Sequence, residues 1–250
     1  MIELARSTWT EVAAHMKSGQ TESGRTTAFL PFGALEQHGP HLPLSTDTLQ
    51  CGEIARRLAE RTDGILLPPV HYGETWGNSG HPGTISLAPS TVTAIAVDIA
   101  RAAAGFGVDA FVIVNGDYGN MNPLVLASRL LQMEHGIPAL VIDYPGLVAA
   151  GDAVKESPWA APGLCHADEM ETSMILAIDP DLVHPDRYAP SYPEMPADFG
   201  HRPIRLGDLA ESGVFGDPRP ATAAKGESII EAVVANALEL VTAFQSAVRG

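Results

Sequence analysis

Residues 110–115 read AFVIVN and residues 140–144 read LVIDY, and these two runs decide the fold class. Strands that are apolar at nearly every position are typical of a parallel sheet whose two faces are both covered. Two other segments have the same short apolar character. The sequence therefore predicts four strands, at Thr27–Leu35, Ile65–Val70, Ala110–Asn115 and Ala139–Tyr144.

Segments with helical spacing of apolar residues lie between and after these strands. In the last of them, Ile230, Val233, Val234 and Leu238 belong to one long apolar stripe. The predicted helices are Thr48–Arg61, Ser90–Phe106 with Ser90 as N-cap, Pro123–His135 and Glu227–Val248. Strands that alternate with helices predict a layered α/β fold.

Composition excludes several classes of protein. The chain has 250 residues, 45% apolar and 18% charged, so it can build a sizeable core and is not disordered. Its net charge of −15 argues against nucleic acids and anionic membranes as partners, because both require a basic surface. Two cysteines are too few for a disulfide framework or an all-cysteine zinc cluster.

Neither a leader nor a membrane span is expected. The N-terminal residues contain no apolar run long enough for a signal peptide, and no stretch approaches the roughly 20 apolar residues of a span. We expect a cytoplasmic protein with one domain over residues 1–250. Residues 180–220 are rich in proline, and we interpret them as a surface excursion. The sequence leaves open whether this excursion is a lid, a subunit contact or a solvent loop without a role.

The densest group of chemically active residues lies in residues 32–48, FGALEQHGPHLPLSTDT. Glu36, His38, His41 and Asp47 fall between a predicted strand and a predicted helix. Open α/β sheets place their sites in such loops, at the carboxyl ends of strands. Glu36 and His38 are two residues apart, so in an extended chain their side chains point the same way. Carboxylates with an imidazole suit Zn²⁺, Mn²⁺ or Fe²⁺, and a carboxylate such as Asp47 can bridge two ions.

Each of these residues also has a simpler interpretation. Asp47 can be the N-cap of a helix that begins at Thr48, Glu36 a surface acid and His38 a hydrogen-bonded core histidine. For any one residue alone the simpler interpretation is favoured. The four together favour a metal site.

Residues 111–123, FVIVNGDYGNMNP, place Asp117 and Tyr118 after another predicted strand, beside the first loop. Both can contribute to the same site, and Tyr118 can line its pocket. Asn-Gly-Asp and Gly-Asn are also ordinary turn sequences, and a helix is expected after Asn120. Spacing alone does not separate these two interpretations.

Residues 165–178, CHADEMETSMILAI, place His166 and Glu171 at the start of an apolar helix. Histidine has its ordinary pKa near neutral pH, so His166 can act as a general acid or base, and Glu171 as a ligand or base. Acids in the first turn of a helix also interact favourably with its dipole. That simpler interpretation explains Asp168 and Glu169 well and His166 less well.

Residues 78–87, NSGHPGTISL, predict a tight loop that brings backbone close to a ligand. Ser79 and His81 are candidate substrate contacts there. For this segment alone, a plain turn is the favoured interpretation.

Together the four segments resemble the creatininase family of metal-dependent amidohydrolases. The match comprises E-x-H-G-x-H-L-P-x-x-x-D at Glu36–Asp47, P-G-T-x-S-L at Pro82–Leu87 and H-A-x-x-x-E-T-S at His166–Ser173. It runs from STWTEV near residue 7 to AAKGE near residue 227 and into the final predicted helix. The resemblance therefore covers nearly the whole chain.

The resemblance implies a single three-layer α/β/α domain with a mostly parallel sheet, a centre of two divalent ions and a homo-oligomer, commonly a hexamer. Family members open cyclic amides such as creatinine, remove formyl groups from pyrimidine precursors or trim a peptide in mycofactocin maturation. Carried over to this chain, Glu36 binds one ion, His38 binds the other and Asp47 bridges both. His166 matches the family's active-site histidine.

The chain departs from the family at residues 115–120, where it has NGDYGN and the family has NGHGGN or NGHYEN. Asp117 therefore replaces a histidine ligand, and as a harder ligand it favours Mn²⁺ or Mg²⁺. Gly119 stands where the creatinine-cleaving form has a glutamate ligand, and Glu171 is the nearest replacement. A lid tryptophan of the creatinine enzyme aligns near Pro145. Creatinine is therefore a poor candidate substrate.

These observations predict a metal-dependent hydrolase that cleaves a non-peptide C–N bond, of the cyclic amide or formamide type, in a small molecule. The expected cofactor is two ions, Zn²⁺ or Mn²⁺, with Fe²⁺ also suitable. The predicted residues are Glu36, His38, Asp47, Asp117 and Glu171 for the metal, His166 and Glu171 for catalysis, and Ser79, His81 and Tyr118 for the substrate.

Two other hypotheses come from different classes. Asp117 and Gly119 motivate a non-catalytic or weakly metal-binding relative that binds a small molecule. A hydrolase with a nucleophilic serine has little support, because the chain contains no G-x-S-x-G motif.

Overall fold

The computed structural model describes residues 1–18, 26–161 and 163–248. Its strands form one sheet in the order β1-β3-β2-β4-β5, and every pairing is parallel. The strands are β1 Ile2–Glu3, β2 Thr27–Phe32, β3 Ile65–Leu66, β4 Ala110–Asn115 and β5 Ala139–Ile142. The predicted parallel sheet is confirmed.

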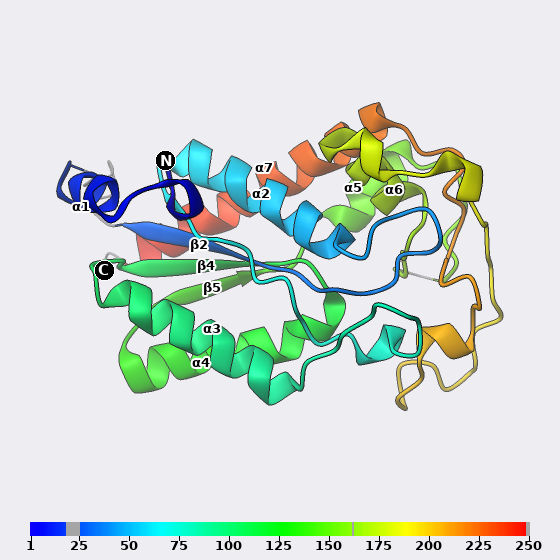
Figure 1. The fold of residues 1–250 in the computed structure, drawn as a ribbon, viewed down its shortest axis with the longest axis horizontal. Helices are drawn as coiled ribbons and strands as arrows, with labels where there is room; N and C mark the ends of the chain where they lie inside the picture. Colours follow the sequence, from blue (N-terminus) through cyan, green and yellow to red (C-terminus); the bar gives the residue numbers. More distant parts are fainter. Residues whose placement is uncertain (19–25, 162, 249–250) are drawn as a thin grey trace.

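Helices cover both faces of the sheet. Helices α3 and α4 lie against one face, and α2, α6 and α7 lie against the other, with α5 packed on α7 (Figure 1). The bounds are α1 Trp9–Ser18, α2 Thr46–Thr62, α3 Pro89–Ala104, α4 Met121–His135, α5 Leu147–Val154, α6 Glu169–Ile178 and α7 Ala223–Val248. This is the three-layer α/β/α arrangement that the resemblance implied.

Alternate residues of β4 enter two separate cores. Val112 and Val114 pack with α2 and α7, whereas Phe111 and Ile113 pack with α3 and α4. All four side chains are buried. Because successive side chains of a strand point to opposite faces, a strand covered on both sides is apolar throughout. The pattern AFVIVN follows from this position.

Three strands end earlier than predicted. β2 ends at Phe32 instead of Leu35, β5 ends at Ile142 instead of Tyr144, and β3 ends at Leu66 instead of Val70. After β3 the chain reads Pro68-Pro69, and proline has no N–H to donate to the sheet. The residues that were assigned to strand ends form loops at the carboxyl-terminal end of the sheet instead.

All four predicted helices begin earlier than predicted, α4 at Met121 instead of Pro123 and α7 at Ala223 instead of Glu227. α2 begins at Thr46 with Ser45 as N-cap, so Asp47 lies in the first turn of the helix and is not its cap. α3 has Ala88 as N-cap and Pro89 as its first residue, so Ser90 is inside the helix. Proline suits this first position because its missing N–H has no partner there anyway.

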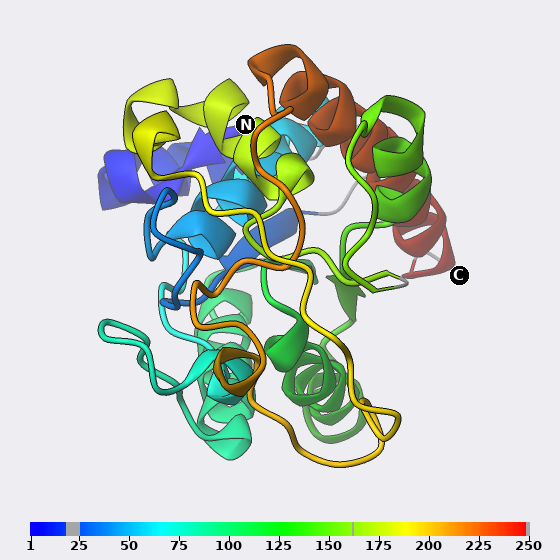
Figure 2. The ribbon, with the colours of Figure 1, turned by 90° about the vertical axis from the view of Figure 1, so that its right-hand side faces the viewer.

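The predicted excursion, residues 180–220, runs across the carboxyl-terminal end of the sheet. Figure 2 looks at this end and shows the segment in yellow and orange. It contains short 3-10 turns at Pro180–Leu182, Pro185–Arg187 and Leu206–Asp208. Backbone hydrogen bonds tie it to the site, since Phe215 N donates to His166 O at 2.9 Å.

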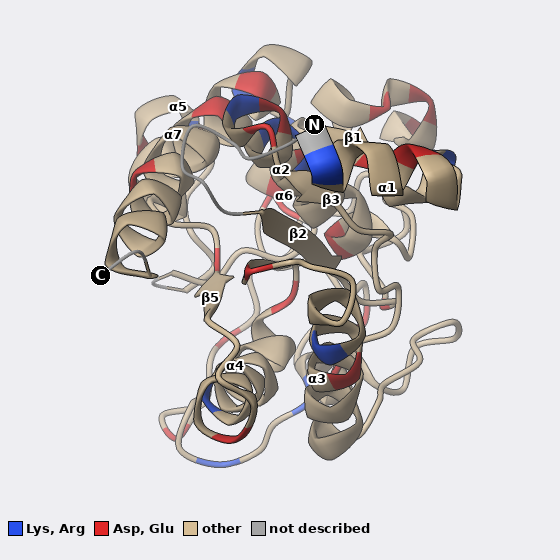
Figure 3. Ribbon diagram, turned by 90° about the vertical axis from the view of Figure 1, so that its left-hand side faces the viewer, with Lys and Arg blue, Asp and Glu red and all other residues tan. Residues whose placement is uncertain are grey.

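On the other side of the molecule, α2 and α7 are joined by ion pairs. Arg57 contacts Glu227 at 2.7 Å and Glu231 at 2.5 Å, and Arg61 contacts Glu231 at 2.6 Å. Figure 3 shows acidic and basic residues together where these helices meet. Exposed pairs of this kind contribute roughly 0–1 kcal/mol each. Among the described residues, none of the helices has the length and apolar character needed to cross a bilayer.

Candidate metal centre

The predicted ligands gather at the carboxyl-terminal end of the sheet. Glu36 and His38 follow β2, and Asp117 follows β4. Asp47 and Glu171 lie in the first turns of α2 and α6. Glu36, His38 and Asp47 are buried, and the other two are half-buried. Three segments that are far apart in the sequence, residues 36–47, Asp117 and Glu171, thus meet at one place.

His38, Asp47 and Glu171 form the first group of potential ligands. His38 Nε2 lies 3.1 Å from Asp47 Oδ1 and 3.7 Å from Glu171 Oε2. One donor atom from each residue lies within 4.8 Å of the other two. A single ion can therefore contact all three side chains.

Glu36, His38 and His166 form the second group, with the same 4.8 Å limit on their donor atoms. His166 Nδ1 lies 3.8 Å from Glu36 Oε1, and the rings of His38 and His166 have centroids 4.4 Å apart. Glu36 and His38 therefore face one region, as their spacing of two predicted. His166, which was predicted as a catalytic residue, borders the same region, with its Nδ1 beyond hydrogen-bond distance of Glu36.

Asp117 lies beside these groups and belongs to neither. Its Oδ1 accepts a hydrogen bond from Gly119 N at 3.2 Å, and its Oδ2 is buried without a partner. The backbone carbonyl of Asp117 is held by Asn115 Nδ2 at 2.7 Å. Asp117 thus directs a free carboxylate oxygen into a protein interior that already contains Glu36 and Asp47.

The free donor atoms fit a cation. Asp117 Oδ2, Asp47 Oδ2 and His38 Nε2 are all buried without a hydrogen bond. His38 Nε2 does lie 3.1 Å from the other oxygen of Asp47, Oδ1, but this contact lacks hydrogen-bond geometry. A buried polar atom without a partner costs roughly 1–3 kcal/mol, and charged atoms cost more. Carboxylate oxygens with an imidazole nitrogen are the donors that Zn²⁺ and Mn²⁺ accept. The residues present therefore fit a divalent metal.

Protonation in the centre reflects this crowding of acids. Burial raises the pKa of Glu36 well above its usual value, and the charges of Asp117 and Asp47 raise it further. Burial also raises the pKa of Asp117 well above its usual value, with the charge of Asp47 as the next cause. Carboxylates that resist ionisation together are expected to ionise when a cation is bound between them.

The pKa values of two histidines of the centre are shifted in opposite directions. Burial alone would lower the pKa of His38, but the charges of Asp47 and Glu171 outweigh it and raise this pKa well above its usual value. Burial and the nearby charge of His38 lower the pKa of His166 well below its usual value. Burial raises the pKa of Glu171 to about 7, and the charge of His38 opposes this rise.

The start of α6 is fixed by a second set of charges. Asp168 is the N-cap, and its Oδ1 accepts hydrogen bonds from Met170 N at 2.8 Å and Glu171 N at 3.3 Å. Its other oxygen pairs with buried Lys155 at 2.9 Å. The simpler interpretation of Asp168 as a helix-start acid is confirmed. This cap sets the direction of α6 and with it the position of Glu171.

Gln37 is a site residue that the sequence did not reveal. Its side-chain Nε2 lies 2.8 Å from Asn78 Oδ1 and 3.2 Å from Gly213 O, and its Oε1 accepts from Gly39 N at 2.9 Å. The loop after β2, the segment near Asn78 and the excursion are thereby joined. An amide side chain has no charge and Gln37 follows no distinctive spacing, so only its position between Glu36 and His38 could have indicated its role.

The predicted substrate contacts lie apart from the metal ligands. Tyr118 is 88% exposed, so its side chain does not pack into the centre. His81 Nε2 lies 3.3 Å from Glu211 O, and Gly207 packs on its ring, so His81 faces the excursion. Ser79 ends a 3-10 turn and is half-buried. None of the three belongs to the two ligand groups.

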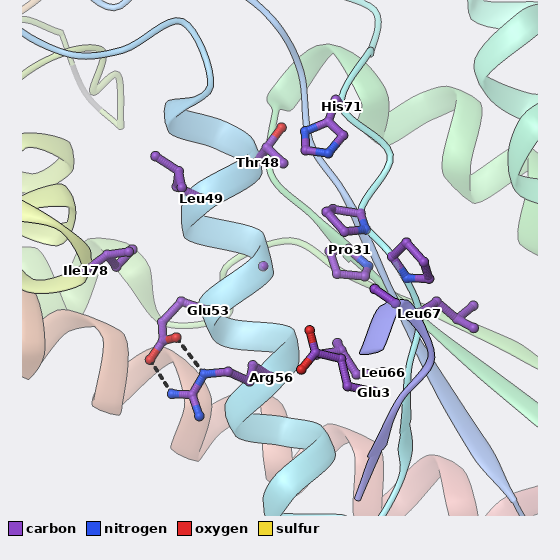
Figure 4. A pocket seen from close by; sticks show the side chains of 14 residues that line it. Glu3, Pro31, Thr48, Leu49, Glu53, Arg56, Leu66, Leu67, His71 and Ile178 are labelled. Carbon is purple, nitrogen blue, oxygen red and sulfur yellow. Dashed lines mark hydrogen bonds and ion pairs between the residues drawn. The ribbon is translucent and has the colours of Figure 1, made fainter. Parts of the chain in front are cut away.

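A cavity of about 290 Å³ lies between α2 and the β1–β3 edge of the sheet (Figure 4). Leu49, Leu66 and Leu67 line it, and the ion pair of Glu53 with Arg56 borders it. None of the predicted ligands or catalytic residues contributes to its walls. Glu3 and His71 also line this cavity, but the unpartnered buried donor atoms of His38, Asp47 and Asp117 lie in the histidine–carboxylate centre, so the chemistry is assigned there.

His41→Gln is expected to make stability less sensitive to acid. The pKa of His41 is lowered from 6.5 to about 4, first by burial and then by the charge of His38. The unfolded chain therefore binds a proton that the folded state resists. The stability present above pH 6.5 is lost as pH falls toward 4, by up to about 3 kcal/mol. Urea unfolding at pH 7 and at pH 4.5 measures this difference.

His184→Gln is the matched control for that prediction, because His184 is exposed and its backbone N–H donates to His41 O at 2.9 Å. It should retain the acid sensitivity of the unaltered protein. An equal loss of stability in the His41 variant and in the control would contradict the prediction.

The fold and this centre define a three-layer α/β protein with a cluster of histidines and carboxylates at the carboxyl ends of a parallel sheet. A family model described as "Creatininase: Creatinine amidohydrolase" matches residues 5–241. The chain belongs to the creatininase family, and the resemblance seen in its sequence is confirmed.

Known relatives have different activities in their names. A mycofactocin precursor peptide peptidase of Mycolicibacterium smegmatis is 34% identical over 226 residues, which cover 87% of this chain and 85% of that protein. A creatinine amidohydrolase of Pseudomonas putida is 30% identical over 248 residues, which cover 91% of each chain. The names include an amidohydrolase and a peptidase, so the chain is a creatininase-family hydrolase.

Solved structures agree with this assignment. A crystal structure of creatinine amidohydrolase (creatininase) has a TM-score of 0.82 and 29% identity, and it covers 96% of both chains. A structure named "Creatininase Mn" has a TM-score of 0.81 and 29% identity, and it covers 96% of this chain and 97% of its own. Another creatininase structure is described as Zn-Zn type. These neighbours are thus manganese or zinc proteins.

Proposed function

We propose that this protein is a metal-dependent hydrolase that cleaves a non-peptide C–N bond, of the cyclic amide or formamide type, in a small molecule. The observation that carries the proposal is the set of free donor atoms on His38, Asp47 and Asp117, buried at one end of the sheet. Unsatisfied buried charge has a stability cost, and a functional site is the common reason for it.

The proposed ligands are Glu36, His38, Asp47, Asp117 and Glu171. We propose two ions, because the donor atoms fall into two groups that share only His38. His38 Nδ1 lies 3.3 Å from Glu36 O, so its proton can be held there and Nε2 left free for one ion. When bound, divalent ions held by these residues would supply an acidified water and would polarise the carbonyl of the substrate.

The chain's own residues complete the reaction. The leaving nitrogen needs a proton, and the sequence offered His166 and Glu171 for this step. Without metal, burial raises the pKa of Glu171 to about 7, so its carboxyl can hold a proton near neutral pH when no ion is bound to it. The excursion runs across this end of the sheet (Figure 2), and we propose that it restricts access of water and large substrates to the centre.

The proposal is tested by metal content and turnover together. Protein purified without added metal should contain bound ions by mass spectrometry, lose turnover with a chelator and regain it with Mn²⁺ or Zn²⁺. Cyclic amides, formamides and lactams form the substrate panel, with a peptide included because a peptidase is among the relatives. Glu36→Ala is the control that should remove turnover.

Less than about one ion per chain that neither metal restores would count against this function. Ligand binding without turnover under those conditions would support the alternative, a non-catalytic small-molecule binder.

A further inference from the structure

If two ions are bound, the second ligand group has no imidazole of its own apart from His166. His38 is the imidazole common to both groups, and its Nε2 faces Asp47 and Glu171. Its other ring nitrogen faces the carbonyl of Glu36. One nitrogen serves one ion, so a nitrogen ligand for the ion beside Glu36 has to come from another residue.

His166 presents such a donor. Resting on the proposed metal-dependent function, we infer that His166 binds the ion beside Glu36 through Nδ1, and that it is a metal ligand where the sequence predicted a proton carrier. Its Nδ1 lies 3.8 Å from Glu36 Oε1, which is too long for a hydrogen bond. Two donors that each lie about 2.0–2.2 Å from one ion are themselves separated by about 3–4 Å.

The ring of His166 is oriented for this role by Gln37. His166 Nε2 lies 2.9 Å from Gln37 O and 2.8 Å from Gln37 Nε2. The two N–H groups of that amide already have acceptors in Asn78 Oδ1 and Gly213 O. Nε2 of His166 can donate to the backbone carbonyl of Gln37, and in that tautomer the lone pair is on Nδ1. A hydrogen bond to the outer ring nitrogen is the usual support of a metal-bound histidine.

Two other histidines near the centre each use Nε2 in a contact outside the ligand groups, and their Nδ1 atoms are buried without a partner. His41 Nε2 lies 2.9 Å from Thr172 Oγ1, and His81 faces Glu211 of the excursion. Of the imidazoles in the described residues, His38 and His166 are the two that fall in the ligand groups. With aspartate at position 117, His166 supplies the second nitrogen.

Metal content of His166 variants tests this inference. At metal concentrations that saturate the unaltered protein, His166→Ala should hold one ion fewer per chain by mass spectrometry. Competition with a chelator should show at least a tenfold weaker affinity for that ion, and the visible absorption of the Co²⁺-loaded protein should change. Asp117→His in the His166→Ala background should restore the lost ion. His81→Ala is the matched control and should keep the full metal content.

The outcomes separate the inference from the function on which it rests. A His166→Ala variant that keeps all its ions at unaltered affinity and the same Co²⁺ spectrum, but loses turnover, overturns the inference and makes His166 the proton carrier. Unaltered protein without any bound ion overturns the proposed function itself. If His166→Ala does not fold, His166→Gln replaces it, and the metal content of that variant with and without Asp117→His decides in the same way.

Discussion

Asp47→Asn is expected to lower turnover by about 10³-fold and, in metal-free protein, to raise the free energy of unfolding by about 1–3 kcal/mol. Asp47 lies 3.1 Å from His38 Nε2, and its second oxygen is buried without a partner. The amide keeps the shape of the side chain but removes a charge that repels Glu36. The same change therefore weakens the metal site and relieves strain in the empty protein, which is the trade-off expected at an active site.

Two measurements check this prediction. Turnover with the best substrate of the panel gives the catalytic loss, and urea unfolding with and without Mn²⁺ or Zn²⁺ gives the stability. The unaltered protein should be stabilised by metal far more than the variant. Asp98→Asn is the control, because Asp98 is exposed on α3 and its loss changes net charge equally. Lower stability of the metal-free Asp47 variant, or turnover within tenfold of normal, would contradict the expectation.

Gly226→Ala is expected to lower the free energy of unfolding by about 3 kcal/mol or more. Gly226 lies where α7 crosses α6, and a Cβ added there would be 1.8 Å from Ser173 O and 2.3 Å from Ser173 C. These are backbone atoms, so no side-chain rotation removes the clash. The two helices must separate, and Glu171 on α6 moves with them. The variant should therefore also bind metal less tightly.

Gly52→Ala is the matched control, since Gly52 is also a helical glycine but has open space where a Cβ would be. The free energy of unfolding of this variant should rise by about 0.5–1 kcal/mol, because alanine has a better helix propensity than glycine. Urea unfolding of both variants gives the comparison. Similar urea midpoints for Gly226→Ala and Gly52→Ala would contradict the close contact between α6 and α7.

The fold was predictable where burial leaves a pattern. β4 is apolar at almost every position because both faces are covered, and the stripe on α7 follows from its one buried face. Helices α1 and α5 were missed. α5 is short, is largely half-buried or exposed, and contains Gly151, which packs on Met170. β1 has two residues, which is too few for any periodic signal.

The site was predictable where its residues are close in sequence. Glu36 and His38 lie together because they are two apart in an extended segment, and Asp47 follows within one loop. The approach of His166 to Glu36 depends on how α6 packs against the sheet, so no local pattern reports that distance. Tyr118 was expected in the pocket because it adjoins Asp117, but adjacent residues of a turn can face opposite ways, and its side chain is exposed.

The two edge strands of the sheet, β1 and β5, have two and four residues. Such short edges expose few unpaired backbone N–H and C=O groups, so they give little template for a strand from another chain. The sheet is thereby protected from edge-to-edge aggregation. If copies of this protein do assemble, they are expected to meet through side chains of helices and loops, and not by forming a continuous sheet.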